Sequence, residues 1–246
     1  MPKILTLNLN YFADKHGPWE DRKLLIAEAI QATQADIVAF QAVAADPEYS
    51  NGKNQALQLK ELLPGFQYSV FVAASKQDNG RQEGNAVISK FPVLSAENIL
   101  LTLLPETPDN VQRLVLKTSF VIDDKPFHLF NGHFSWVGEQ TTSNVKDAFP
   151  FLQAEKDNAL LVGDFNTDPK DQLLKPLLKA GWKDLWTETH HGQEGFTFES
   201  DKLFTRIDYA LANATLFNRS LKVEIVQKEK DRKIRLSDHL GLLITL

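Results

Sequence analysis

The chain has 246 residues, of which 43% are hydrophobic, and 27 basic against 32 acidic residues give a formal net charge of -5. This length and composition predict one α/β domain over residues 1–246, and the acidic balance gives no general electrostatic reason to bind nucleic acid or an anionic membrane. There is no cysteine, which excludes disulfides and thiolate metal sites.

The N-terminus runs directly into strand-like sequence, without the apolar segment and cleavage site of a signal peptide. No stretch approaches the ~18 apolar residues of a membrane span. We therefore expect a cytoplasmic enzyme or binding protein, and a monomer. A secreted mature form stays open, because a processed chain would look identical.

The first part of the chain predicts alternating strands and helices. Residues 4–9 form an apolar strand with Asn8 at its end, residues 18–30 form a helix, and residues 36–43 form a second strand. This strand-helix-strand crossover brings Asn8 and Gln41 to the same edge if the strands are parallel. A helix around residues 57–63 and strands over 67–74 and 83–92 complete this half.

The next segment predicts a β-hairpin, with strands over 111–122 and 126–134 joined across 123–125. Alternation places His133 among apolar neighbours on one strand face, so a buried structural histidine is an alternative to a functional one. Residues 141–156 have helical spacing, but Pro150 should kink or divide that helix.

The central apolar run Leu160-Leu161-Val162-Gly163 breaks abruptly into Asp164 and Asn166. Polar groups at the end of a buried strand mark a ligand-binding edge, although Asp and Asn there often only form a turn. A helix capped by Asp168 should follow, and then strands over 206–211, 221–227 and 240–246.

Polar side chains recur at the predicted strand ends, too often to be independent accidents. Oxygen ligands suit a hard cation such as Mg²⁺, histidines suit acid/base work, and amides suit phosphate oxygens. These residues are Asn8, Gln41, Glu83, His133, Asp164, Asn166, Asp208, Asp238 and His239.

Together these stretches resemble the endonuclease/exonuclease/phosphatase superfamily, whose members include DNase I. The resemblance implies a four-layer α/β sandwich, with two packed mixed sheets flanked by helices. The matching stretches occur in the family's order and are Leu5-Thr6-Leu7-Asn8, Phe40-Gln41-Ala42-Val43, Glu83-Gly84-Asn85-Ala86-Val87-Ile88-Ser89, Asn131-Gly132-His133, Gly163-Asp164-Phe165-Asn166, Arg206-Ile207-Asp208-Tyr209 and Ser237-Asp238-His239.

The resemblance also implies roles for two groups of residues. Asp164 would orient or deprotonate the attacking water, and Asn166 would hold the phosphate. His239, oriented by Asp208, would be the second acid/base or transition-state group.

By the same resemblance, His133 would contact a phosphate oxygen and be oriented by Glu83. Asn8 would lie near substrate and metal, and Asp238 would lie near the metal, which is expected to be Mg²⁺ or Mn²⁺. The implied reaction is metal-dependent hydrolysis of a phosphoester, preferably a phosphodiester in a nucleic acid or a small molecule.

Position 42 departs from the family pattern, because the expected metal-ligand Glu is Ala42. A methyl group cannot bind a cation, and Asp46 lies beyond the strand end. Either the chain is a natural pseudoenzyme that binds a phosphodiester or polyanionic partner without cleaving it, or the alanine was installed to inactivate an enzyme. Loss of a single group favours the second explanation.

The substrate is not determined by these motifs. Trp136 could stack on a base or sugar, or it could anchor its loop. A basic segment between Lys228 and Arg235 could contact a polyanion, but Glu229 and Asp231 within it favour a solvated hairpin tip.

Overall fold

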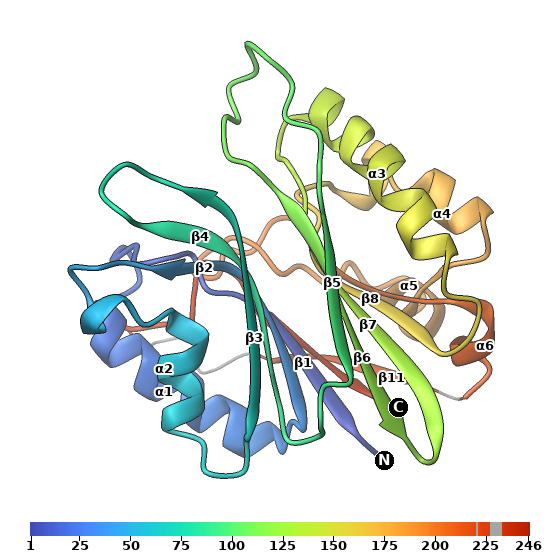
Figure 1. Ribbon diagram of the computed structural model, residues 1–246. Helices are drawn as coiled ribbons and strands as arrows, with labels where there is room; N and C mark the ends of the chain where they lie inside the picture. The colour runs from blue at the N-terminus through green and yellow to red at the C-terminus, as the bar shows by residue number, and fades with distance from the viewer. Residues whose placement is uncertain (220, 227–232) are drawn as a thin grey trace.

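The structure is a computed structural model that describes residues 1–219, 221–226 and 233–246. Within these residues the strands form two six-stranded mixed sheets that pack face to face, and helices lie on the outer sides (Figure 1). The four-layer α/β sandwich expected from the sequence is confirmed.

The first sheet has the strand order β11-β12-β1-β2-β4-β3. Strands β1 and β2 are parallel, as expected, and their register pairs Asn8 with Gln41. Its strands are β1 (Lys3–Asn8), β2 (Ile37–Ala45), β3 (Tyr68–Lys76), β4 (Gln82–Ser89), β11 (Lys222–Val226) and β12 (Gly241–Thr245).

The second sheet has the strand order β5-β6-β7-β8-β10-β9. The register pairs His133 with Asp164 across the parallel strands β7 and β8, and Asp164 with Asp208 across the antiparallel strands β8 and β10. Three predicted site residues therefore lie side by side. The strands are β5 (Ser95–Leu100), β6 (Leu114–Ile122), β7 (Lys125–His133), β8 (Ala159–Asp164), β9 (Lys183–Asp184) and β10 (Asp208–Ala212).

Helices flank the sheets and close separate apolar cores. Helices α1 and α2 pack on the first sheet, while α3 and α4 pack on the second, and a third core lies between the sheets (Figure 1). No described helix is long and apolar enough to span a membrane. The helices are α1 (Trp19–Thr33), α2 (Gln55–Glu61), α3 (Gly138–Gln153), α4 (Lys175–Lys179), α5 (Leu185–Thr189) and α6 (Ala214–Phe217), with 3-10 turns at Ser50–Gly52 and Pro169–Asp171.

Two expected helices differ from the sequence interpretation. Helix α3 runs through Pro150 as one element and is not divided. The helix expected after Asp168 is shorter than its leucines suggested. Asp168 caps only a 3-10 turn, and the left-handed backbone of Gln172 (φ 58°) ends that turn before α4 begins.

Candidate active site

Asp164 is the centre of a buried polar cluster at the end of β8. Its Oδ2 accepts hydrogen bonds from Asn8 Nδ2 at 2.8 Å and Asn166 Nδ2 at 3.2 Å, and its Oδ1 accepts one from the Asn166 backbone N–H at 2.9 Å. Burial raises the pKa of Asp164 to about 6, against the opposing effect of the nearby His239. The carboxyl group therefore holds a proton more readily than an exposed aspartate does.

His239 lies between two carboxylates. Its Nδ1 is 2.9 Å from Asp208 Oδ2, and its Nε2 is 3.7 Å from Asp164 Oδ2. Burial alone would lower the pKa of His239, but the charges of Asp208 and Asp164 raise it to about 10. The structure thus brings together the predicted Asp208 and His239 pair and keeps the imidazole protonated at neutral pH.

His133 has a different partner from the one predicted. The expected contact with Glu83 is wrong in this structure, because Glu83 Oε1 accepts hydrogen bonds from Arg81 at 2.8 Å. His133 Nε2 instead lies 2.8 Å from Arg113 Nη1 and 3.4 Å from Asp164 Oδ2. Burial and the Arg113 charge hold the pKa of His133 well below its usual value, so the ring is neutral and accepts from Arg113.

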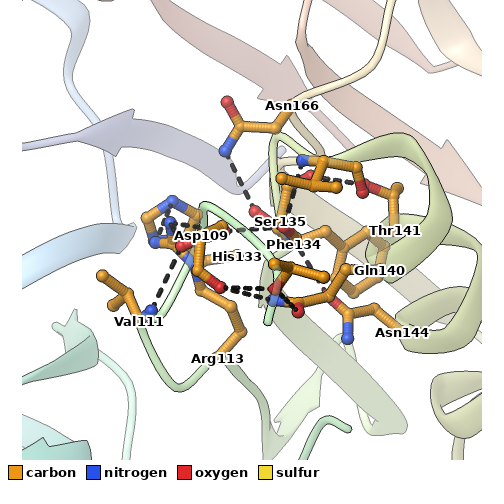
Figure 2. Close-up of polar contacts among 12 residues, drawn as sticks. Asp109, Val111, Arg113, His133, Phe134, Ser135, Gln140, Thr141, Asn144 and Asn166 are labelled. Atoms are coloured by element: carbon orange, nitrogen blue, oxygen red, sulfur yellow. Dashed lines mark hydrogen bonds and ion pairs between the residues drawn. The ribbon is translucent and has the colours of Figure 1, made fainter. Parts of the chain in front are cut away.

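Arg113 is a site residue that the sequence interpretation missed. Its Nη2 lies 3.3 and 3.2 Å from the two carboxylate oxygens of Asp109, which also accepts a hydrogen bond from Ser135 Oγ at 2.6 Å (Figure 2). Gln140 on α3 donates to the Asp109 carbonyl at 3.3 Å and fixes this loop. The only sequence signal was an Asp and an Arg four residues apart before a strand.

Ala42 occupies the expected ligand position and is 2% exposed. Its backbone is left-handed (φ 50°), at the point where the register between β2 and β4 shifts. Asp46 does not replace the missing carboxylate, because its Oδ1 accepts from the Glu48 backbone N–H and its Oδ2 lies 3.9 Å from Arg81.

The described residues contain two groups whose ligand atoms lie within 4.8 Å of one another and could hold a metal ion. One consists of Asp164, Asp208 and His239, and the other of His16, Glu199 and Asp201.

The first group coincides with the predicted site. The expected ligand Asp238 lies beside it, with Oδ1 3.9 Å from His239 Nε2. Next to position 42, the buried Gln41 Oε1 has no hydrogen-bond partner within the described chain. The carboxylates of Asp164, Asp208 and Asp238 fit a divalent cation, with one anionic ligand fewer than the family pattern.

The remaining predicted residues are placed as follows. Asn166 Nδ2 also donates to the Phe134 carbonyl at 3.0 Å, so its amide N–H groups are engaged within the protein (Figure 2). Trp136 is 55% exposed beyond the end of β7 and is not packed as a loop anchor. The basic residues Lys228, Lys230 and Arg232 lie outside the described residues.

The sequence profile of the Endonuclease/Exonuclease/phosphatase family matches residues 5–239, so the chain belongs to this family. A search of curated proteins found no match.

Solved structures share the fold at low sequence identity. A protein of this family from Leptotrichia buccalis C-1013-b is 21% identical, with 100% of this chain and 99% of that chain covered and a TM-score of 0.78. The mannosyl-6-phosphatase of Bacteroides thetaiotaomicron VPI-5482 is 20% identical (coverage 100% and 99%, TM-score 0.71). The human Nocturnin catalytic domain with bound sulfate is 19% identical (coverage 99% and 93%, TM-score 0.72).

Proposed function

We propose that this chain is a metal-dependent phosphoester hydrolase that cleaves a phosphodiester by in-line attack of an activated water, with its activity reduced by Ala42. The observation that carries the proposal is that two groups meet in one buried site. Asp164 is a carboxyl group with a raised pKa, and His239 is a protonated imidazole. An acid and a base whose environments separate their pKa values are what such a reaction requires.

Asp164 is the proposed base. Hydrogen bonds from Asn8 and Asn166 hold its carboxylate, and a pKa of about 6 leaves it ionised at neutral pH but still able to accept a proton from water. Asn166 therefore acts by holding Asp164, because both of its amide N–H groups are engaged within the protein.

His239 is the proposed cationic partner. Its imidazolium, fixed by Asp208, donates a hydrogen bond to the oxygen on which negative charge develops. Arg113 supplies a second fixed cation beside neutral His133, and both would face the phosphoryl group.

A divalent cation, Mg²⁺ or Mn²⁺, would supply charge neutralisation and a more acidic bound water. Asn8 and Asp238 are the proposed ligands beside Asp164, and position 42 contributes none.

The test is Ala42→Glu compared with Ala42→Gln, which adds similar volume without the charge. Metal chemistry of this kind supplies several kcal/mol and each ~1.4 kcal/mol is tenfold, so only the Glu variant should raise hydrolysis by orders of magnitude. Hydrolysis of an aryl phosphodiester, nucleic acids, nucleotides, phospholipids and inositol phosphates is measured with Mg²⁺, with Mn²⁺ and with EDTA. If the Glu variant binds metal yet hydrolyses no substrate, the catalytic assignments fail together.

The second candidate is a natural pseudoenzyme that binds a phosphodiester or polyanionic partner without cleaving it. The supporting observation is that Asp46 bonds to Glu48 and approaches Arg81 instead of reaching position 42. Unaltered phosphodiester binding in EDTA, together with an inactive Glu variant, would favour this candidate.

A further inference from the structure

Tyr11 lies in the turn after β1 and was not among the predicted site residues. Its ring lines a small cavity together with Glu83, Asn85, Arg113 and His133. The cavity has room for about one water molecule, which is also the size of one phosphoryl oxygen. Tyr11 therefore adjoins the candidate active site on the side where Arg113 contacts His133.

The fold holds Tyr11 firmly in this place. Its backbone N–H donates to the Ala42 carbonyl at 2.8 Å, and its own carbonyl accepts from Gln55 Nε2 at 2.6 Å. The Arg81 guanidinium lies 6.0 Å from the ring centroid and also pairs with Glu83, so the carboxylate in the cavity wall is already matched by a cation.

Two hydrogen-bond donors at this cavity are unused. Within the described part of the chain, the half-buried Tyr11 donates its hydroxyl to no protein group, and the buried Arg113 Nε has no partner. Tyr209 differs, because its ring is buried and its hydroxyl donates to the Thr167 carbonyl at 2.8 Å. The Arg113 Nε is buried and unpaired among these residues, which calls for an explanation. An acceptor oxygen of a ligand that also meets the half-buried Tyr11 provides one.

We propose that Tyr11 is a substrate-binding residue whose hydroxyl, together with the Arg113 guanidinium, donates hydrogen bonds to one non-bridging oxygen of the phosphoryl group. Burial raises the pKa of Tyr11 to about 12, which keeps the phenol protonated and able to donate at neutral pH. The choice of a phosphoryl group as the bound anion rests on the proposed function. The pair of donors, the Tyr11 hydroxyl and the Arg113 guanidinium, does not require the metal.

The test is calorimetric titration of inorganic phosphate into the chain as given, at pH 7 in EDTA, so that neither metal nor hydrolysis enters the result. Tyr11→Phe removes one donor to a charged acceptor, and phosphate should bind about tenfold more weakly or worse. The fold should not suffer, because the deleted oxygen donates to no group among the described residues. Urea unfolding checks this.

Tyr68→Phe is the matched control. Tyr68 begins β3 and pairs with Ser89, at the opposite end of the sheet from Glu83. The Tyr68→Phe variant should bind phosphate with the same affinity as the unmodified chain.

Equal phosphate affinity of the Tyr11→Phe variant and the unmodified chain would overturn the proposal. So would a lack of phosphate binding to the unmodified chain. Neither result decides the proposed hydrolysis, because the Ala42→Glu assay tests that reaction separately.

Discussion

Asp208 Oδ2 accepts a hydrogen bond from His239 Nδ1 at 2.9 Å, while Asp208 itself is paired in register with Asp164 on β8. Asp208→Asn keeps the shape of this contact but removes the charge that most strongly raises the pKa of His239. The imidazole pKa should therefore fall well below 10. An NMR titration of the His239 resonances measures this in the chain as given.

The same substitution has a kinetic consequence in the Ala42→Glu background. General acid/base groups contribute about 10²- to 10⁴-fold, so loss of the oriented imidazolium should reduce kcat within that range and change KM little. A change in KM with a normal kcat would contradict this role. It would show that Asp208 positions the substrate and not His239.

The free energy of unfolding should fall as the pH rises from about 6.5 to 10. His239 has an unfolded pKa near 6.5 and a folded pKa of about 10, so the folded state binds more protons in this window. Its stabilising contribution is complete below 6.5 and is lost as the pH passes 10, with a slope of at most about 1.4 kcal/mol per pH unit.

Urea unfolding at several pH values in EDTA measures this slope, and His239→Gln is the control because it cannot titrate. The raised pKa of Asp164 also makes the free energy of unfolding fall as the pH rises, but at lower pH, between its ordinary pKa of 3.8 and about 6. Parallel pH profiles for the unmodified chain and the His239→Gln variant would contradict the assignment of a protonated His239.

The sequence predicted the fold well where burial is two-sided. The run Leu160 to Val162 is apolar without interruption because β8 is covered on both faces, and such a run identifies a central strand directly. Strand β5 was missed, because its residues are almost all exposed and carry no apolar alternation. The left-handed Gln172 that shortens the following helix has no glycine or asparagine to signal it.

The candidate site was predictable to the extent that strand register determines it. His133, Asp164 and Asp208 stand at the ends of neighbouring strands, so a correct strand order brings them together. The partner of His133 depends instead on a loop conformation, because Arg113 reaches it only when Gln140 and Asp109 hold that loop. No spacing rule in the sequence describes such a contact.

Arg113→Met should destabilise the fold through its effect on Asp109. The Asp109 carboxylate is buried, and removal of its guanidinium partner leaves an uncompensated charge, which costs about 3–5 kcal/mol. The pKa of His133 should rise at the same time, because the Arg113 charge is one of the causes that lower it. Urea unfolding and an NMR titration measure the two effects.

The double variant Asp109→Asn with Arg113→Met separates the charge effect from the loss of packing. The double variant removes both charges, so it should recover part of the stability that the Arg113→Met variant lost. If the double variant is less stable by the sum of both single losses, Asp109 and Arg113 do not interact as the structure shows.

Gly163→Ala should destabilise the strand pair that carries His133 and Asp164. Gly163 has φ +137° on β8, and a Cβ atom there would lie 1.9 Å from the Gly132 carbonyl oxygen of β7. Because this oxygen belongs to the backbone of a buried strand, it cannot move aside without breaking the sheet register. We expect a loss of more than about 3 kcal/mol in the free energy of unfolding, as for other severe overpacking.

Gly181→Ala provides the matched control, since Gly181 also has a left-handed backbone (φ +97°) but no atom within 4 Å of the added carbon. The Gly181→Ala variant should lose only about 1–2 kcal/mol in the free energy of unfolding, because alanine is strained in the left-handed conformation. Equal losses for the two variants would mean that β7 and β8 separate enough to admit a methyl group. The register that places His133 beside Asp164 would then lose its physical basis.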